Sequence, residues 1–139
     1  MRRVFTRSDS QWLGQSDAEI AVRGIAEALA TDFFPRLRVA DTVKFGWLAP
    51  GSGADGTCDP YRRVIRLDPN LLIDPRRRGL CVVMLHELCH LATRNELTDH
   101  GPRWRACMAR CGLDPMGGAL AYNSPLDQWI ATRMRGPMR

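Results

Sequence analysis

The sequence predicts an α+β fold in which several helices pack around a small antiparallel sheet. An apolar stretch at residues 80–92 indicates a central helix, and residues 39–47 and 61–67 alternate apolar and polar side chains as half-buried strands do. Helix-start signals at Ser16 and Ser124 open two further apolar patterns. A chain of 139 residues can bury a sizeable core, so we expect residues 1–139 to form one domain.

The N-terminal part of the sequence indicates an arm followed by a helix. Residues 1–15 have no clear period and are interpreted as an extended arm. Ser16 and Glu19 form a capping box that starts a helix. Pro35 ends this helix because its ring blocks helical hydrogen bonding.

The strand signals come next and leave one position open. Residues 39–47 alternate apolar and polar side chains, with Asp41 as the one exception. A turn-rich loop separates them from residues 61–67. We expect these two strands to pair antiparallel. A third short strand is expected either near residues 57–59 or in the N-terminal arm.

The central helix is expected to begin with Asp74 as N-cap and Pro75 at its first position, and to run to about Arg94. Asn95 is suited to end it in the left-handed conformation.

Two more helices are expected near the C-terminus. One covers residues 102–111, with Pro102 at its first position and Gly112 just past its end. The other starts after Ser124, and residues 135–139 are expected to form a mobile tail.

The central helix contains the sequence His86-Glu87-Leu88-Cys89-His90. Residues four apart share a helical face, so both imidazoles can reach one Zn²⁺ at about 2.0–2.1 Å. Glu87 lies roughly 100° around the helix from His86, which is where a general base for an attacking water belongs. A catalytic zinc site takes three protein ligands, so another segment must supply the third.

His100 is the predicted third ligand, because all three histidines of the chain lie in this region and a short loop returns it beside the helix. Glu96 lies in the same loop and is the alternative, although the Gly-Pro-x-Trp sequence that follows favours His100. Asp99 is expected either to orient a ligand imidazole or simply to face solvent. A chance occurrence of the motif is disfavoured, because these polar groups would be costly to bury without a metal.

A family resemblance supports this interpretation. His86-Glu87-x-x-His90 followed by His100-Gly101-Pro102-x-Trp104 resembles the SprT-like/Spartan metalloproteases, whose third ligand opens a His-Gly-x-x-aromatic stretch at the start of a helix. The strand and turn at residues 64–69 also look like that family, and the likeness covers roughly residues 39–112. One departure is that the chain has no paired Cys-x-x-Cys zinc ribbon, which many bacterial SprT proteins carry.

The resemblance implies a zincin-like fold, in which the helix with the His-Glu-x-x-His motif is followed by a helix bearing the third ligand. It implies that His86, His90 and His100 bind zinc and that Glu87 is the catalytic base of an endopeptidase. Its substrates would be proteins bound or crosslinked to DNA. Arg103 and Tyr122 are candidate donors to the oxyanion. The alternative function is a non-catalytic module in which zinc only stabilises a DNA- or protein-binding domain.

The charge of the chain is compatible with a nucleic-acid partner. The net charge is +5 and Lys44 is the only lysine. Arg76, Arg77 and Arg78 are expected in the first turn of the central helix, where arginine forks and free N–H groups suit a phosphate. A solvated surface cluster, or a genome that favours arginine codons, explains the same residues without DNA.

The five cysteines predict reduced thiols. An odd number without a signal-peptide pattern favours a cytoplasmic protein, and no run is apolar and long enough to span a membrane. Cys89 is interpreted as a small buried hydrophobe. Cys107 and Cys111 share a helical face and could hold a metal, although packing is the simpler interpretation. The sequence does not indicate an oligomeric state.

Overall fold

The computed structural model describes residues 12–134. The elements are α1 (Asp17–Phe33), α2 (Val39–Thr42), β1 (Lys44–Trp47), β2 (Gly56–Asp59), β3 (Val64–Leu67), the 3₁₀ helix η1 (Pro69–Leu72), α3 (Arg78–Ala92), α4 (Pro102–Cys111) and α5 (Pro125–Arg133). The predicted α+β class is confirmed. The expected arm lies mostly outside the described residues, as does the expected tail, and the single domain stays a prediction.

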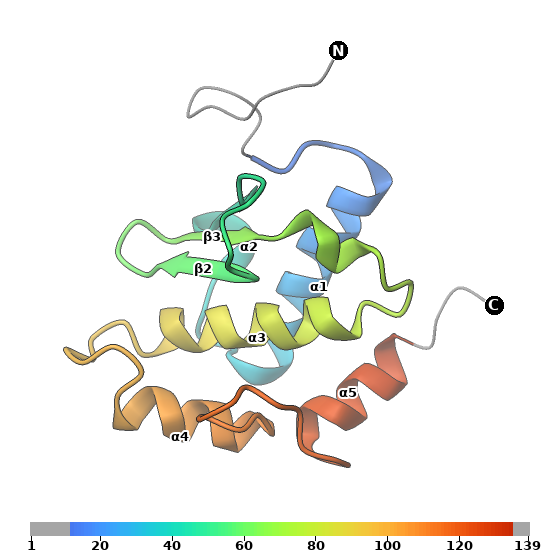
Figure 1. The fold of residues 1–139 in the computed structure, drawn as a ribbon. Helices are drawn as coiled ribbons and strands as arrows, with labels where there is room; N and C mark the ends of the chain where they lie inside the picture. The colour runs from blue at the N-terminus through green and yellow to red at the C-terminus, as the bar shows by residue number, and fades with distance from the viewer. Residues whose placement is uncertain (1–11, 135–139) are drawn as a thin grey trace.

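Helix α3 is the centre of the arrangement. The three-stranded sheet lies on one side of it and α4 on the other, with α1 packed across its back (Figure 1). Its buried apolar residues include Leu80, Met84, Leu85 and Leu88, each with no exposed surface. Among the described helices, none is long and apolar enough to cross a membrane.

Helix α1 begins as predicted. The Ser16 hydroxyl accepts a hydrogen bond from the Glu19 backbone N–H at 3.2 Å, and the Glu19 carboxylate accepts one from the Ser16 N–H at 3.3 Å. The same carboxylate accepts a hydrogen bond from the Trp47 indole at 2.9 Å. Glu19 therefore connects the start of α1 to β1, and hydrogen bonds from Gly14, Ser16 and Trp47 lower its pKa to about 2.

The sheet is mixed. The predicted antiparallel pairing of residues 39–47 with residues 61–67, which contain β1 and β3, was wrong. The strand order is β1-β3-β2; β1 runs parallel to β3, and β2 runs antiparallel to β3. The reason is a tight turn: the Asp59 carboxylate accepts hydrogen bonds from the N–H groups of Tyr61 and Arg62 at 3.1 and 3.0 Å, and Arg63 takes a left-handed conformation. This turn pairs β3 with β2 as a hairpin.

The two predicted locations for a third strand both form β-structure. One is β2 itself, which contains Thr57–Asp59. The other is an isolated antiparallel bridge between Trp12 and Gly46 at the end of the arm. By contrast, the strand predicted from residue 39 begins only at Lys44. Val39–Thr42 forms a helical turn whose buried Val39 packs into the core.

The start of the central helix also differs from its prediction. Asp74 does cap a turn, since its carboxylate accepts hydrogen bonds from the N–H groups of Arg76 and Arg78 at 2.9 and 3.1 Å. However, Arg77 has a φ of 57°, which interrupts the helical path, so α3 begins at Arg78. Only one of the three arginines therefore lies inside the helix.

The ends of the later helices follow the prediction more closely. Helix α4 begins at Pro102 and ends before Gly112, whose φ is 106°. Helix α5 begins after Ser124, whose hydroxyl caps the Asp127 N–H at 3.3 Å. Helix α3 ends at Ala92 with Thr93 as its cap, and Asn95 does not take the left-handed conformation predicted for it; His100 does, with a φ of 55°.

The contribution of Glu19 to stability should depend on pH. Because its pKa in the folded protein is about 2, below the ordinary glutamate value of 4.5, the stabilisation is present above pH 4.5 and is lost as the pH falls toward 2. Glu19→Gln should therefore lower the free energy of unfolding most above pH 4.5, and the difference from the wild type should shrink on acidification. Chemical denaturation across this range measures it, with Asp17→Asn in the same helical turn as control. A difference that does not change with pH contradicts the assignment.

Candidate metal centre

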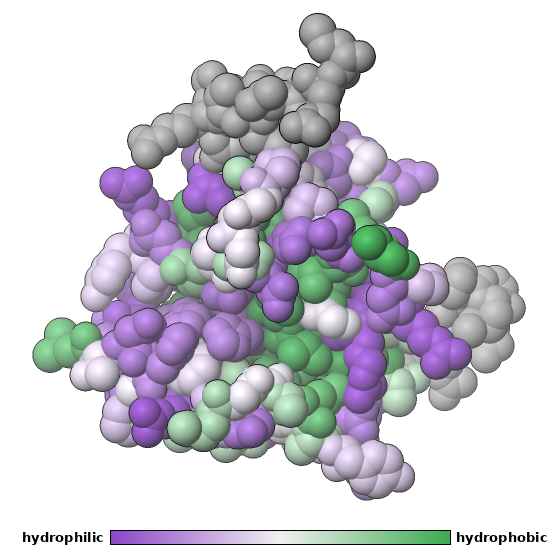
Figure 2. Space-filling model, in the orientation of Figure 1, coloured by the Kyte–Doolittle hydropathy of each residue, from purple (hydrophilic) through white to green (hydrophobic). Residues whose placement is uncertain are grey.

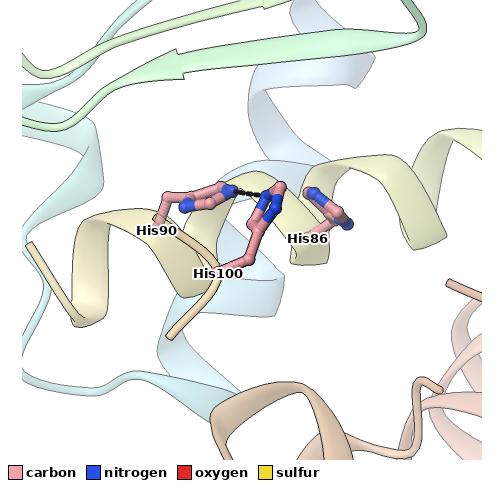
Figure 3. Close-up of side chains that lie close together, drawn as sticks. All are labelled: His86, His90 and His100. Carbon is pink, nitrogen blue, oxygen red and sulfur yellow. Dashed lines mark hydrogen bonds between the residues drawn. The ribbon is translucent and has the colours of Figure 1, made fainter. Parts of the chain in front are cut away.

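Three histidines converge beside α3. His86 and His90 lie one turn apart on α3, and His100 comes from the loop before α4; their rings point toward one another (Figure 3). One ring nitrogen of each lies within 4.8 Å of the corresponding atoms of the other two. The Nε2 atoms of His90 and His100 are 3.1 Å apart. The structure thus brings together the three residues that the sequence singled out.

Trp104 forms a wall beside all three rings, a role that the sequence did not reveal. Its ring centroid lies 5.0 Å from that of His86, 5.1 Å from that of His90 and 4.3 Å from that of His100. Trp104 is only 3% exposed and belongs to the hydrophobic core. Because Trp104 fills the space next to the imidazoles, it limits the ring positions available to them.

Asp99 lies on the outer side of the histidines. Its carboxylate oxygens are 4.0 Å from His90 Nδ1 and 3.8 Å from His100 Nδ1. These distances are too long for direct hydrogen bonds, but they place a negative charge near the Nδ1 atoms of both rings while the Nε2 atoms face each other. This position is suited to orienting ligand imidazoles.

The donor set fits a metal ion. Burial lowers the pKa of His86 to about 4, and burial also lowers the pKa of His90. The neighbouring histidines act in the same direction, because two imidazolium cations this close repel each other. Both rings are therefore neutral near pH 7 and keep a lone pair for coordination. A divalent cation would give the lone pairs of the three neighbouring ring nitrogens a common partner.

Glu87 lies beside this centre and is buried, with 5% of its surface exposed. Burial, with a smaller contribution from the Asp99 charge, raises the pKa of its carboxyl group to about 7. The edge strand β2 approaches it closely at Gly56. A Cβ at Gly56 would lie 2.6 Å from Val83 Cγ1 and 3.2 Å from Glu87 Oε2, so only glycine lets β2 lie against α3 here.

A cavity of about 400 Å³ opens onto His86, Glu87 and His100. Its remaining walls are Asp55 and Gly56 at the start of β2, Val82 and Val83 on α3, Trp104, and the loop residues Pro115, Met116, Gly117 and Gly118. On the face drawn in Figure 2, hydrophobic side chains gather over α3 between hydrophilic ones. The polar groups of the site therefore stand in a cleft that also has apolar walls, formed by Val82, Val83, Trp104, Pro115 and Met116. Neither Arg103 nor Tyr122 lines this cavity.

Glu96 has a different role from the one considered in the sequence. Its carboxylate accepts hydrogen bonds from the backbone N–H groups of Arg103 and Trp104, at 2.7 and 2.9 Å. It therefore caps the N-terminus of α4, where a negative charge is favoured. A Cβ at Gly101 would lie 2.7 Å from Glu96 Cδ, so the glycine after His100 makes room for this cap. Glu96 is thus engaged with α4 and does not join the histidine group.

A second cluster lies in the contact between α3 and α4. Cys89, Cys107 and Cys111 are all buried, and their sulfur atoms lie within 4.8 Å of one another. The prediction that Cys89 is buried is confirmed. The sequence indicated the pairing of Cys107 with Cys111 on one helical face, but it could not show that α3 contributes a third thiol.

The fold and the site define an α+β protein with a three-histidine group that can hold a metal ion. Comparison with protein-family models matches residues 24–120 to the SprT-like family. The chain therefore belongs to the SprT-like family, and the match extends beyond both ends of the resemblance seen in the sequence. Neither a search of curated proteins nor a search of solved structures gave a match.

Loss of the Glu96 cap should weaken both α4 and the position of His100. Glu96→Ala should lower the free energy of unfolding by about 0.5–2 kcal/mol, the usual cost of a lost helix cap. It should also lower the affinity for a divalent metal ion by about 10- to 100-fold, because the loop that presents His100 loosens. Glu96→Gln, which keeps one acceptor oxygen, should lose less.

Chemical denaturation and isothermal titration with Zn²⁺ measure the two effects. Glu27→Ala, which removes an exposed carboxylate from α1, is the matched control and should change neither quantity. Wild-type metal affinity in Glu96→Ala would show that the cap does not position His100.

Proposed function

We propose that the protein is a zinc-dependent endopeptidase with a zincin-like arrangement of its active site. The observation that carries this proposal is the convergence of His86, His90 and His100 next to the buried carboxyl group of Glu87, at the edge of a cleft. Membership of the SprT-like family supports it.

Zinc is proposed as the ion because three imidazoles are one of its usual catalytic ligand sets. His86, His90 and His100 would hold it. When bound, zinc supplies a Lewis acid that polarises a carbonyl group and makes a nearby water more acidic.

Glu87 is proposed as the general base. Its pKa of about 7 lies near the value at which proton transfer to and from a side chain is most effective. A cation held by the neighbouring histidines would favour the ionised form, which is the form that accepts a proton. Glu87 would then take a proton from the attacking water and return it to the leaving amine. Its burial excludes bulk water from that exchange.

The substrate is proposed to bind as an extended strand along β2. Within the described residues β2 pairs only with β3 and is an edge strand, and it packs directly on α3. An extended peptide can add to such an edge through main-chain hydrogen bonds. Because Gly56 lies next to Glu87, this would carry the peptide past the catalytic carboxylate.

A second candidate function is a non-catalytic module stabilised by zinc. The cluster of three histidines would serve either function. Glu87 favours the enzyme, because a structural site gains nothing from a buried carboxyl group whose ionisation costs energy.

Glu87→Gln separates the two functions. The zinc-loaded wild type should cleave an unfolded protein such as casein, and Glu87→Gln should lower the rate by about 10²- to 10⁴-fold while zinc content is kept, because only the base is lost. Asp41→Asn, at an exposed carboxylate on α2, is the control. Zinc-loaded wild type that cleaves no tested protein, with or without DNA, favours the module.

DNA-bound proteins are proposed as substrates, with Arg76, Arg77 and Arg78 contacting the nucleic acid. The net charge of +5 supports this. The structure gives these arginines other partners as well: Arg77 Nη1 donates to the Asp74 carbonyl at 2.8 Å, and Arg78 Nη1 pairs with Asp127 at 3.1 Å. Arg76 and Arg78 are both exposed, whereas Arg77 is partly buried. Because Arg78 is paired with Asp127, Arg76 is the arginine chosen for the test.

Affinity for single-stranded DNA should fall steeply as salt is raised, since each phosphate contact releases counterions. Arg76→Ala should weaken binding and reduce the slope of log affinity against log salt by about 0.7, the value for one contact to a single strand. Fluorescence anisotropy with a labelled oligonucleotide measures this. Arg38→Ala, which removes another exposed arginine, just before α2, is the control. Absent binding, or binding that salt does not change, removes the DNA proposal.

A further inference from the structure

We propose that Cys89, Cys107 and Cys111 form a second metal site, separate from the histidines, which takes a thiophilic d¹⁰ cation such as Zn²⁺ or Cu⁺. We call these three residues the thiol site. Cys89 comes from α3, and Cys107 and Cys111 lie one turn apart on α4.

The spacing of the sulfur atoms fits one shared ion. The Sγ atoms of Cys89 and Cys107 are 3.2 Å apart, and all three sulfurs lie within 4.8 Å of one another. A cation about 2.3 Å from each sulfur needs them roughly 3.8–4.0 Å apart. That separation lies between the Cys89–Cys107 distance of 3.2 Å and the 4.8 Å that bounds all three sulfur–sulfur distances. The three sulfurs are therefore already close to the spacing that one shared ion requires.

The surroundings select the type of ion. The exposed fractions of Cys89, Cys107 and Cys111 are 0, 7 and 0%, so the sulfurs face protein on nearly all sides. A dry set of three thiols offers no oxygen ligand for Mg²⁺ or Ca²⁺, whereas Zn²⁺ and Cu⁺ bind thiolates strongly. The Arg110 guanidinium lies 3.8 Å from Cys107 Sγ. Three thiolates around a divalent ion leave one negative charge, which this cation can balance.

The alternative is that the thiols only fill space, as buried cysteines often do. Cys81 provides a comparison within the same helix. It is equally buried, at 0% exposure, but it does not belong to the thiol site. If packing were the whole role, replacing any of these cysteines by alanine would have similar effects on the protein. A metal site instead predicts that Cys81 behaves differently from the other three.

An ion in the thiol site would join the two helices that build the histidine centre. Cys89 adjoins His90 in the sequence, and Cys107 lies one turn after Trp104 on α4. Binding to the folded state alone would therefore stabilise the contact between α3 and α4. This role does not depend on peptidase activity.

The test is a titration of the reduced, metal-free, full-length protein without oxygen, using Cd²⁺ in one arm and Cu⁺ in the other. The near-ultraviolet charge-transfer band from thiolate to metal reports the thiol site, because imidazole ligands do not produce it. Four proteins are compared: the wild type, Cys107→Ala, Cys81→Ala, and the double variant His86→Ala/His90→Ala. Circular dichroism of each metal-free protein checks its fold.

The band should appear with at least one of the two ions in the wild type, in Cys81→Ala and in the double histidine variant, and should saturate in that variant at one equivalent. It should be lost in Cys107→Ala. Retention in the histidine variant makes the result independent of the proposed peptidase site. The proposal is overturned if neither ion gives a band in the wild type, a result that needs no variant to fold. A band of equal strength in Cys107→Ala, or its loss in Cys81→Ala, also overturns it.

Discussion

The structure depends on one constraint: α3 must carry a carboxyl group and two imidazoles through a hydrophobic core. Leu85 and Leu88, on either side of Glu87 in the sequence, have no exposed surface. An ionised carboxylate in such a place is costly. Burial therefore raises the pKa of Glu87. The surrounding elements are arranged so that one face of α3 opens onto a cleft. The rest of the helix stays in the core.

The parts of that cleft come from separate segments, each fixed by its own local interaction. Strand β2 reaches α3 because Gly56 has no side chain. The loop carrying His100 is fixed to the N-terminus of α4, where the Glu96 carboxylate accepts hydrogen bonds from two backbone N–H groups. Trp104 then occupies the space behind the rings. The geometry of the histidines is therefore set by the backbone and by packing.

The site could be predicted from the sequence to a greater extent than the fold. His86, Glu87 and His90 share a helix, so their relative positions follow from helix geometry alone. His100 could be found because few histidines are available in the chain. The roles of Trp104 and Glu96 could not be found, because they depend on how the loop after α3 folds back onto α4. The third thiol at Cys89 was hidden for the same reason.

The fold predictions failed where local pattern leaves direction or boundary undetermined. Alternation at residues 61–67 identifies a strand but carries no information about its direction, and the hairpin with β2 made its pairing with β1 parallel. Asp74 and Pro75 do form a capped turn, yet the left-handed Arg77 ends that turn before the helix begins. The capping box at Ser16, the cap at Ser124 and the glycine after α4 were reliable signals because each requirement is met within a few residues.

The proposed activity requires that the three imidazoles hold one divalent ion. A crystal structure of the zinc-loaded protein, with anomalous scattering recorded at the zinc edge, tests it most directly. One anomalous peak is expected about 2.0–2.1 Å from a ring nitrogen of each of His86, His90 and His100. A peak that His100 does not reach, or the absence of any peak beside His86 and His90, would contradict it.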